Sequence, residues 1–243
     1  MASEPLGPRA RARAAMVEDV IAVARRQLAE VGPGGLSVRS VTRELGIAAS
    51  AVYRYFASRD HLLTALIIDS YERLGSAVAV AGDGLPESAL TRRWVTIWHA
   101  TREWAVAHPH EYALVYGTPV IGYAAPQDTV LPATRVVARL AAVVIDAERL
   151  GLRQAPADLL DPVPTVGLRS DAEQILAALP DLGLDPAVSP ADALRVTRAW
   201  TELFGAISFE LFGHFVGSIS HPRDNLDVLA RSWAVRIGLP PEV

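Results

Sequence analysis

Apolar residues recur at helical spacing along most of this chain, and clusters of Gly and Pro interrupt the pattern. A representative face consists of Val17, Ile21, Ala24, Leu28 and Val31, and the segment Gly-Pro-Gly-Gly at 32–35 ends it. The sequence shows no convincing strand alternation and no internal repeat. With 51% hydrophobic and 21% charged residues, it has enough apolar side chains for a core. The sequence therefore predicts an all-α protein.

The helices near the N-terminus are short and carry clear start and stop signals. Ser37 is placed to cap the second helix, and Gly46 ends it because glycine tolerates a left-handed backbone. A third helix is expected over about 49–56, and Ser58 is placed to cap a fourth over 59–75. Two short helices joined through a glycine and packed on a first helix predict a helix-turn-helix head.

The rest of the chain is expected to form longer helices separated by loops. These helices are expected at about 87–107, 109–116, 128–150, 170–179, 190–216 and 224–237, with loops at 117–126 and 151–170. The loop at 117–126 is either a mobile wall of a pocket or a rigid connector. The predicted parts of the chain are a flexible basic arm at 1–13, a helix-turn-helix domain at 14–60, and a helical ligand-binding and dimerisation domain at 61–243.

Charge is divided unevenly along the chain. Residues 1–60 hold nine Arg and six Asp or Glu, a net charge of +3, so the remainder carries −7 of the total of −4. A basic N-terminal segment favours contact with phosphates, and Arg9, Arg11 and Arg13 suit either such contact or a solvated tail. The chain has no cysteine, no secretory signal and no apolar stretch of membrane-spanning length. We therefore expect a soluble, cytoplasmic protein without membrane contact.

The predicted third helix suits the major groove of double-stranded DNA. Ala49, Ser50 and Ala51 are small, so its N-terminal end can approach base edges closely. Residues expected to lie beside them on the outer face, or to contact the sugar-phosphate backbone, are Ser37, Arg39, Tyr53, Arg54, Tyr55 and Arg59. The alternative is a generic three-helix core with solvated arginines.

The run LGIAASAVYRYFASRDHLL resembles the signature of the TetR family of transcriptional regulators. The likeness rests on Leu45, Gly46, Tyr53, Phe56, Leu62 and Leu63. It implies that the helix from Ala49 enters the major groove and that Tyr53 and Arg59 contact phosphates. The family more often has Lys at the position of Arg59, and often Ser or Thr at the position of Ala48, which here cannot cap through its side chain.

The segment around 94–126 is rich in aromatic residues and resembles the C-terminal ligand-binding domain of a TetR branch called the WHG domain. The likeness covers roughly 85–150 and rests on Trp104, His108, Pro109, Tyr112, Gly117 and Pro119. A predicted effector pocket is lined by Trp98, Trp104, Tyr112, Tyr116 and Tyr123, although the alternative is that each packs in the core. The spacing of His108, His110 and Glu111 does not favour a metal site, and no cofactor is predicted.

The last two predicted helices suit a dimer interface. Their apolar side chains cover more than one stripe, which an isolated surface helix would not show. Predicted interface residues are Trp200, Phe204, Phe212, Leu229 and Trp233, and the alternative is burial against the helix at 128–150. The resemblance implies a homodimeric repressor of a near-palindromic operator that a small hydrophobic or aromatic effector releases. The first alternative function is an enzyme, but the sequence contains no catalytic motif that supports it. The second alternative is a helical binding protein whose N-terminal head has no affinity for DNA.

Overall fold

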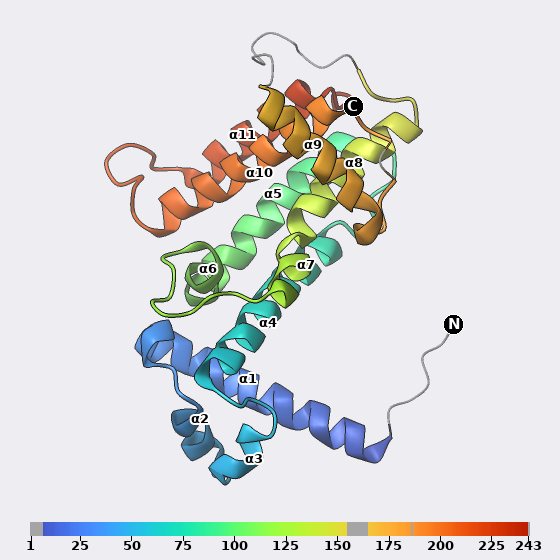
Figure 1. Ribbon diagram of the computed structural model, residues 1–243. Coiled ribbons are helices and arrows are strands. Elements are labelled where there is room, and N and C mark those ends of the chain that lie inside the picture. Colours follow the sequence, from blue (N-terminus) through green and yellow to red (C-terminus); the bar gives the residue numbers. More distant parts are fainter. Residues whose placement is uncertain (1–6, 155–164, 186, 243) are drawn as a thin grey trace. The chain divides into compact units, whose positions relative to one another are not determined.

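The structure is a computed structural model that describes residues 7–154, 165–185 and 187–242. The described residues form helices and no strand, so the predicted all-α class is confirmed. The α-helices are α1 Pro8–Gly35, α2 Val38–Leu45, α3 Ala49–Tyr53, α4 Arg59–Ala81, α5 Leu90–Ala107, α6 Pro109–Tyr116, α7 Val130–Ala133, α8 Arg135–Arg149, α9 Val166–Ala178, α10 Pro190–Leu211 and α11 Pro222–Ile237 (Figure 1). Two 3-10 turns, η1 Gln127–Thr129 and η2 Leu179–Leu182, precede α7 and follow α9.

The chain divides into two compact units. The head unit contains the described residues through Tyr71 together with His108–Val130, and the C-terminal unit contains Glu72–Ala107 and the described residues from Leu131 onward. Helix α4 begins in the head unit and ends in the C-terminal unit. The head unit thus includes, besides residues 14–60 of the predicted helix-turn-helix domain, the first half of α4 and α6 with the loop after it.

The head unit is held by an apolar core and by polar contacts that join α1, α4 and the α6 segment. The core contains Val20, Ala24, Leu28, Val41, Val52, Phe56, Leu62, Leu63, Leu66 and Leu114, all buried. Arg25 binds Asp69 at 2.6 Å, and its Nε lies 3.5 Å from Glu111. The hydroxyls of Thr64 and Tyr123 share a hydrogen bond of 2.8 Å, and the Tyr71 hydroxyl donates to the carbonyl of Val115 at 3.3 Å. The bond of Thr64 with Tyr123 ties the loop at 117–126 to α4, and the bond of Tyr71 with Val115 ties α6 to the same helix.

The C-terminal unit is built around α5, which packs against α8 and α11. Trp94 and Trp98 on α5 are fully buried, and the Trp94 indole donates to the carbonyl of Ala230 on α11 at 3.0 Å. Arg93 on the same helix binds Asp146 on α8 at 2.7 Å. Helix α10 packs against α8, α9 and α11, so it contacts most of the unit.

Several helix bounds differ from those that the sequence predicted. Residues 8–13, assigned to a flexible arm, form the first turns of α1, whereas 1–6 lie outside the described residues. The predicted helix at 128–150 is divided into η1, α7 and α8; between α7 and α8, the backbone N–H and the hydroxyl of Thr134 both donate to the carbonyl of Leu131, at 3.2 Å and 2.8 Å, in a tight turn. Helix α10 ends at Leu211 instead of Val216, since Gly213 turns the chain with a φ of +80°. The helix expected at 170–179 starts earlier, at Val166, because the Thr165 side chain caps it there.

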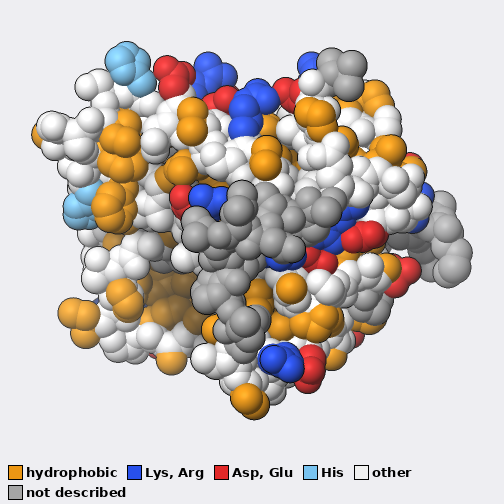
Figure 2. All heavy atoms as spheres, turned by 90° about the horizontal axis from the view of Figure 1, so that it is seen from above, with side chains coloured by type: hydrophobic (Ala, Val, Ile, Leu, Met, Phe, Trp, Pro, Cys, Tyr) orange, Lys and Arg blue, Asp and Glu red, His pale blue; other side chains and the backbone are white. Residues whose placement is uncertain are grey.

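Figure 2 shows one face of the protein, on which apolar side chains are spread widely and only a few arginine and acidic groups lie among them. Within the part of the chain that the structure describes, none of the helices combines the length and apolarity that crossing a bilayer requires.

Candidate functional site

The geometry of α2 and α3 is set by local signals. Ser37 caps α2 by accepting a hydrogen bond from the backbone N–H of Ser40 at 3.1 Å, as its position predicted. Gly46 ends α2 with a φ of +66°, a left-handed conformation that side chains with a β-carbon resist. Ala48 precedes α3 without a side-chain cap, which is also as expected. The connection between the two helices is therefore specified by residues within a few positions of it.

Helix α3 presents one face to the core and the other to solvent. Val52 is fully buried, whereas Ser50 and Tyr53, three residues apart on the opposite side, are exposed. Ala49 and Ala51 are half-buried at its N-terminal end, so no bulky side chain blocks approach to Ser50. The helix ends at Tyr53, earlier than predicted, because Tyr55 and Phe56 both donate to the carbonyl of Val52 in a tight turn.

Arginines surround this exposed face. Arg39 on α2 and Arg54 after α3 are both exposed. The guanidinium groups of Arg54 and Arg13 lie 5.9 Å and 5.8 Å from the ring centroid of Tyr55, which is half-buried. Tyr55 thus packs between two cations instead of projecting freely. The contact also places Arg13, from the first turns of α1, next to α3.

Arg59 makes contacts within the head that the sequence did not reveal. Its guanidinium donates to the carbonyls of Leu36, at 3.2 Å, and Pro33, at 2.7 Å. A third nitrogen lies 3.7 Å from Asp60. These bonds satisfy carbonyls next to the break in α1 at Gly32, so Arg59 has a structural role in joining α1 to α4.

The aromatic residues predicted to line an effector pocket are divided between the two units. Trp98 and Trp104 lie on α5 in the C-terminal unit and are buried. Tyr112 is fully buried in the head unit, its ring centroid 5.2 Å from that of Tyr116, and Tyr123 binds Thr64 there. Burial raises the pKa of Tyr116 well above its usual range, and the neighbouring Tyr71 and Tyr112 add to the effect. Each of the five therefore has a packing role.

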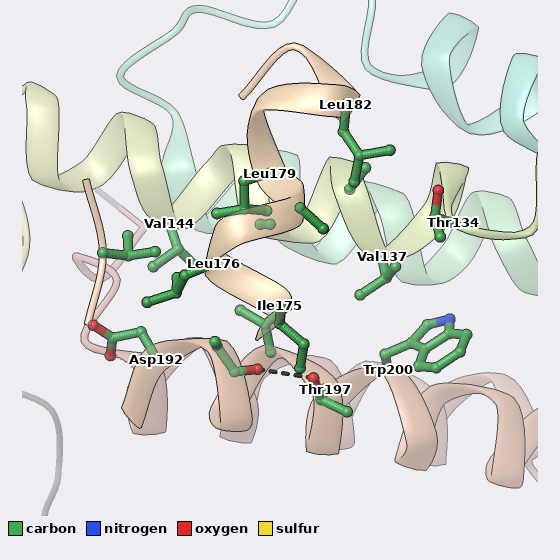
Figure 3. Close-up of a pocket in the computed structure, with 16 residues that line it drawn as sticks. Thr134, Val137, Val144, Ile175, Leu176, Leu179, Leu182, Asp192, Thr197 and Trp200 are labelled. Carbon is green, nitrogen blue, oxygen red and sulfur yellow. Dashed lines mark hydrogen bonds between the residues drawn. The ribbon is translucent and has the colours of Figure 1, made fainter. Parts of the chain in front are cut away.

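A cavity lies elsewhere in the C-terminal unit, between α8, α9 with η2, and α10 (Figure 3). Its volume is about 270 Å³, it is partly open to solvent, and none of the five predicted aromatic residues lines it. We call it the α8–α10 cavity. Its apolar walls include Val137, Ala141, Val144, Leu176, Leu179 and Val196. Sequence reasoning missed this cavity, because its walls come from three helices far apart along the chain.

A buried ionic network lies at one end of this cavity, where Asp192 is part of the wall. Asp192 on α10 accepts hydrogen bonds from Arg153, at 2.9 Å, and from the Ser189 hydroxyl, at 2.6 Å. Burial opposes ionisation of Asp192, but these bonds and the charge of Arg153 outweigh it and lower the pKa of Asp192 to about 2. Arg153 also donates to the carbonyl of Ile237 at 3.0 Å. The network joins the ends of α8, α10 and α11.

The predicted dimer residues are only partly available to a second chain. Phe204 and Trp233 are buried, Trp200 and Leu229 are half-buried, and Phe212 is 44% exposed. Trp200 also lines the α8–α10 cavity. Other exposed apolar residues on or near α10 and α11 are Phe209, Val216, Val228 and Val235. The apolar surface that a partner could cover thus lies at Phe209 and Phe212, which the sequence also suggested, and at Val216, Val228 and Val235, which it did not.

Comparison with known proteins identifies the family. A model of the bacterial regulatory proteins of the tetR family matches residues 20–66, and a model of the tetracyclin repressor-like C-terminal domain matches residues 94–233. The chain belongs to the TetR family. The predicted resemblance is confirmed, and the C-terminal match extends well beyond the 85–150 expected from the aromatic segment. TetR proteins are DNA-binding regulators of transcription and not enzymes.

Individual relatives agree with this assignment. The HTH-type transcriptional regulators Rv1816 of Mycobacterium tuberculosis (strain ATCC 25618 / H37Rv) and Mb1846 of Mycobacterium bovis (strain ATCC BAA-935 / AF2122/97) are each 38% identical over 211 residues, which is 86% of either chain. The crystal structure of SCO4313, a protein described as regulatory, superposes with a TM-score of 0.70 at 28% identity, over 93% of this chain and 98% of that one. The TetR regulator PfmR of Thermus thermophilus shares the fold, with a TM-score of 0.54 at 13% identity, over 91% of this chain and 99% of that one.

Proposed function

We propose that this TetR regulator is a repressor that binds a near-palindromic operator as a homodimer in the cytoplasm, and that a small hydrophobic or aromatic effector releases it. The observation that carries the proposal is the exposed face of α3. There Ser50 and Tyr53 project outward while Val52 packs in the core. Small side chains at the start of a recognition helix permit close approach to base edges in the major groove.

The predicted DNA contacts divide into two groups by what each side chain offers. Ser50 and Arg54 are exposed beside the small residues and are proposed to read bases, with Ala49 and Ala51 against thymine methyl groups. Tyr53 and Arg39 are exposed and are proposed to bind phosphates. Ser37, Tyr55 and Arg59 already have partners within the head, so any contact of theirs with phosphate comes in addition to a structural role.

Dimerisation is proposed through α10 and α11. The exposed apolar side chains of Phe209, Phe212 and Val228 support it, because a second copy would remove them from water. A two-fold axis then relates two heads, and their recognition helices reach successive major grooves on one side of the duplex. The operator is therefore proposed to be a near-palindrome.

Release is proposed to pass along two connections. Helix α4 continues from the head unit into the C-terminal unit, and α6 follows directly after α5 through His108. Within the head unit, Arg25, Tyr71 and Tyr123 fix α4 and the α6 segment to one another and to α1. An effector that binds one arrangement of the C-terminal unit more tightly would lower DNA affinity by its differential affinity for the two states.

Selection of bound duplexes from a random pool, followed by mobility-shift titration, tests the proposal. Tyr53→Ala is expected to weaken every duplex about tenfold, whereas Arg54→Ala is expected to change the preference between operators. Arg39→Ala should reduce the dependence of affinity on salt by about one counterion per half-site. Arg92→Ala, which removes an exposed arginine on α5, is the matched control and should bind like the wild type. Wild-type affinity of Tyr53→Ala for all duplexes would refute the placement of α3.

A further inference from the structure

The α8–α10 cavity has the size and concavity of a small-molecule site. Its volume of about 270 Å³ is roughly twice the ~150 Å³ of an apolar protein cavity that binds benzene. Asp192 and Trp200 lie at opposite ends of it in Figure 3. They are eight residues apart along α10, so the cavity is about 12 Å long at the helical rise per residue. A molecule of about ten to fourteen heavy atoms fits these dimensions.

Its walls are almost entirely apolar, and the polar groups among them are largely satisfied. The Thr134 hydroxyl donates to the carbonyl of Leu131 at 2.8 Å, and the Thr197 hydroxyl donates to that of Ala193 at 2.9 Å. The Trp200 indole nitrogen is buried and has no hydrogen-bond partner among the described residues, but it is a neutral donor. Binding here therefore depends on removal of apolar surface from water and not on ionic contacts.

The charges at the Asp192 end of the cavity argue against an ionic ligand. Asp192 is ionised at neutral pH, but Arg153 and Arg195, the latter at 3.1 Å, both bind it and balance its charge, so it offers no free charge to a ligand. Arg153, the cation nearest to it, is already bound to Asp192, Glu148 and the carbonyl of Ile237. A cationic ligand would meet Asp192 oxygens that Arg153 and Ser189 occupy. Neither sign of charge would replace its lost hydration in this cavity.

We infer that the α8–α10 cavity is the effector site and that it takes an uncharged, largely apolar molecule of about ten to fourteen heavy atoms. This inference rests on the proposed sensing role of the C-terminal unit. It places the site away from the aromatic residues Trp98, Trp104, Tyr112, Tyr116 and Tyr123, and it assigns Trp200 to the ligand and not to the dimer interface.

The test compares two probes of nearly equal size that differ in charge. Binding of 1-decanol and of decanoate to the free full-length protein is measured at pH 7 by calorimetry and by the shift in melting temperature. The wild type should bind 1-decanol saturably and decanoate at least tenfold more weakly. Equal affinity for the two probes, or no binding of either 1-decanol or shorter alcohols up to their solubility, would overturn the inference.

Variants locate the site. Ala141→Phe fills the cavity and should weaken 1-decanol binding at least tenfold, whereas Ala177→Phe, exposed on α9 and outside the cavity, should bind within twofold of the wild type. Leu176→Ala enlarges the cavity and should move the preferred alcohol to a chain about two carbons longer, since each buried methylene adds a fixed gain. The Leu176→Ala variant keeps the test decisive if Ala141→Phe does not fold. Unchanged binding in Ala141→Phe together with an unchanged chain-length preference in Leu176→Ala would place the ligand elsewhere, such as at the aromatic residues.

Oligomeric state and DNA binding separate the remaining outcomes. If the Ala141→Phe substitution by itself, without any ligand, changed the oligomeric mass measured by sedimentation, the cavity would belong to an interface between copies and the inference would fail. Loss of operator affinity on adding 1-decanol, absent in Ala141→Phe, supports both the inference and the proposed function. If 1-decanol bound saturably in the cavity but did not change operator affinity, the cavity would be a binding site but not the effector site, and the inference would fail. Normal operator binding without any probe binding would reject this inference and leave the DNA-binding proposal intact.

Discussion

The exposed face of α3 and the α8–α10 cavity are both candidate binding sites, but they are built in opposite ways. The face of α3 is made by a five-residue helix whose start and end depend on residues no more than a few positions away. The cavity is made by helices that begin at residues 135, 166 and 190 and meet only in the folded unit. A site built from local signals can therefore be predicted from its sequence, whereas a site formed by gaps between helices cannot.

The two regions also differ in what keeps them rigid. Around α3, stability comes from apolar packing of Val52 and Phe56 beneath an exposed polar surface. Around the cavity, packing is incomplete by definition, and the buried pair of Arg153 and Asp192 holds the helix ends together. Stability should therefore depend on the size of apolar side chains around α3, and on charge and pH around the cavity.

Removal of the aromatic ring of Phe56 should have the largest effect on stability. Phe56→Ala leaves a void beneath α3 and is expected to lower the free energy of unfolding by about 3–5 kcal/mol. Hydrogen exchange should accelerate in α1–α4 before it changes in α10 and α11. Tyr53→Ala, an exposed change on the same helix, serves as the control and should leave the free energy within about 0.5 kcal/mol. Equal destabilisation by the two changes would contradict the orientation of α3.

Breaking the ionic network should lower the free energy of unfolding somewhat less than the Phe56 change does. Arg153→Ala leaves Asp192 buried without its main partner and is expected to lower the free energy of unfolding by about 3 kcal/mol. The matched control is Arg149→Ala, which removes an exposed arginine that binds Glu87 and Asp146. Chemical denaturation of that variant should give a curve close to the wild type. A similar loss in both variants would mean that the network is not the element that holds the cavity end.

The same network predicts a dependence on acid. Because the pKa of Asp192 falls from its usual 3.8 to about 2 on folding, its contribution is complete above pH 4 and is lost as pH falls toward 2. Ionised Asp192 therefore contributes about 2 kcal/mol to the free energy of unfolding, because a pKa difference of one unit corresponds to about 1.4 kcal/mol. Asp192→Asn should remove this part of the pH dependence, so the difference in unfolding free energy between wild type and variant should narrow by that amount between pH 5 and pH 2. A constant difference would show that Asp192 ionises normally.

The smallest expected effect concerns the backbone between α2 and α3. Gly46→Ala should cost about 1 kcal/mol, because an alanine resists the φ of +66° observed there. Gly167→Ala is the control: Gly167 lies within α9 with open space where its β-carbon would stand, so the change should stabilise by about 0.5 kcal/mol. Thermal melting of the two variants should therefore shift in opposite directions. A shift in the same direction would weaken the assignment of Gly46 as a required left-handed residue.

Within the head, the sequence predicted the parts that depend on near neighbours. The Ser37 and Ser58 caps, the stop at Gly46, and the burial of Val52 and Phe56 all appear as expected. It did not predict that Arg59 would bind the carbonyls of Pro33 and Leu36, more than twenty positions away. Long side chains reach partners that only the packing of α1 against α4 brings near, so their roles cannot be assigned from spacing.

In the C-terminal half, the sequence located the apolar side chains but not how they meet. Aromatic residues on α5 and α6 suggested one pocket, yet Trp98 and Tyr112 pack into different units. Helical spacing, caps and turn residues by themselves determined the all-α class and the helix-turn-helix, and the resemblance of the run from Leu45 to Leu63 to a family signature indicated the family. The tertiary structure alone decided which apolar faces meet completely and which leave a cavity. The physical reason is that helix formation depends on hydrogen bonds and side chains within one turn, whereas packing depends on the shapes of several helices together.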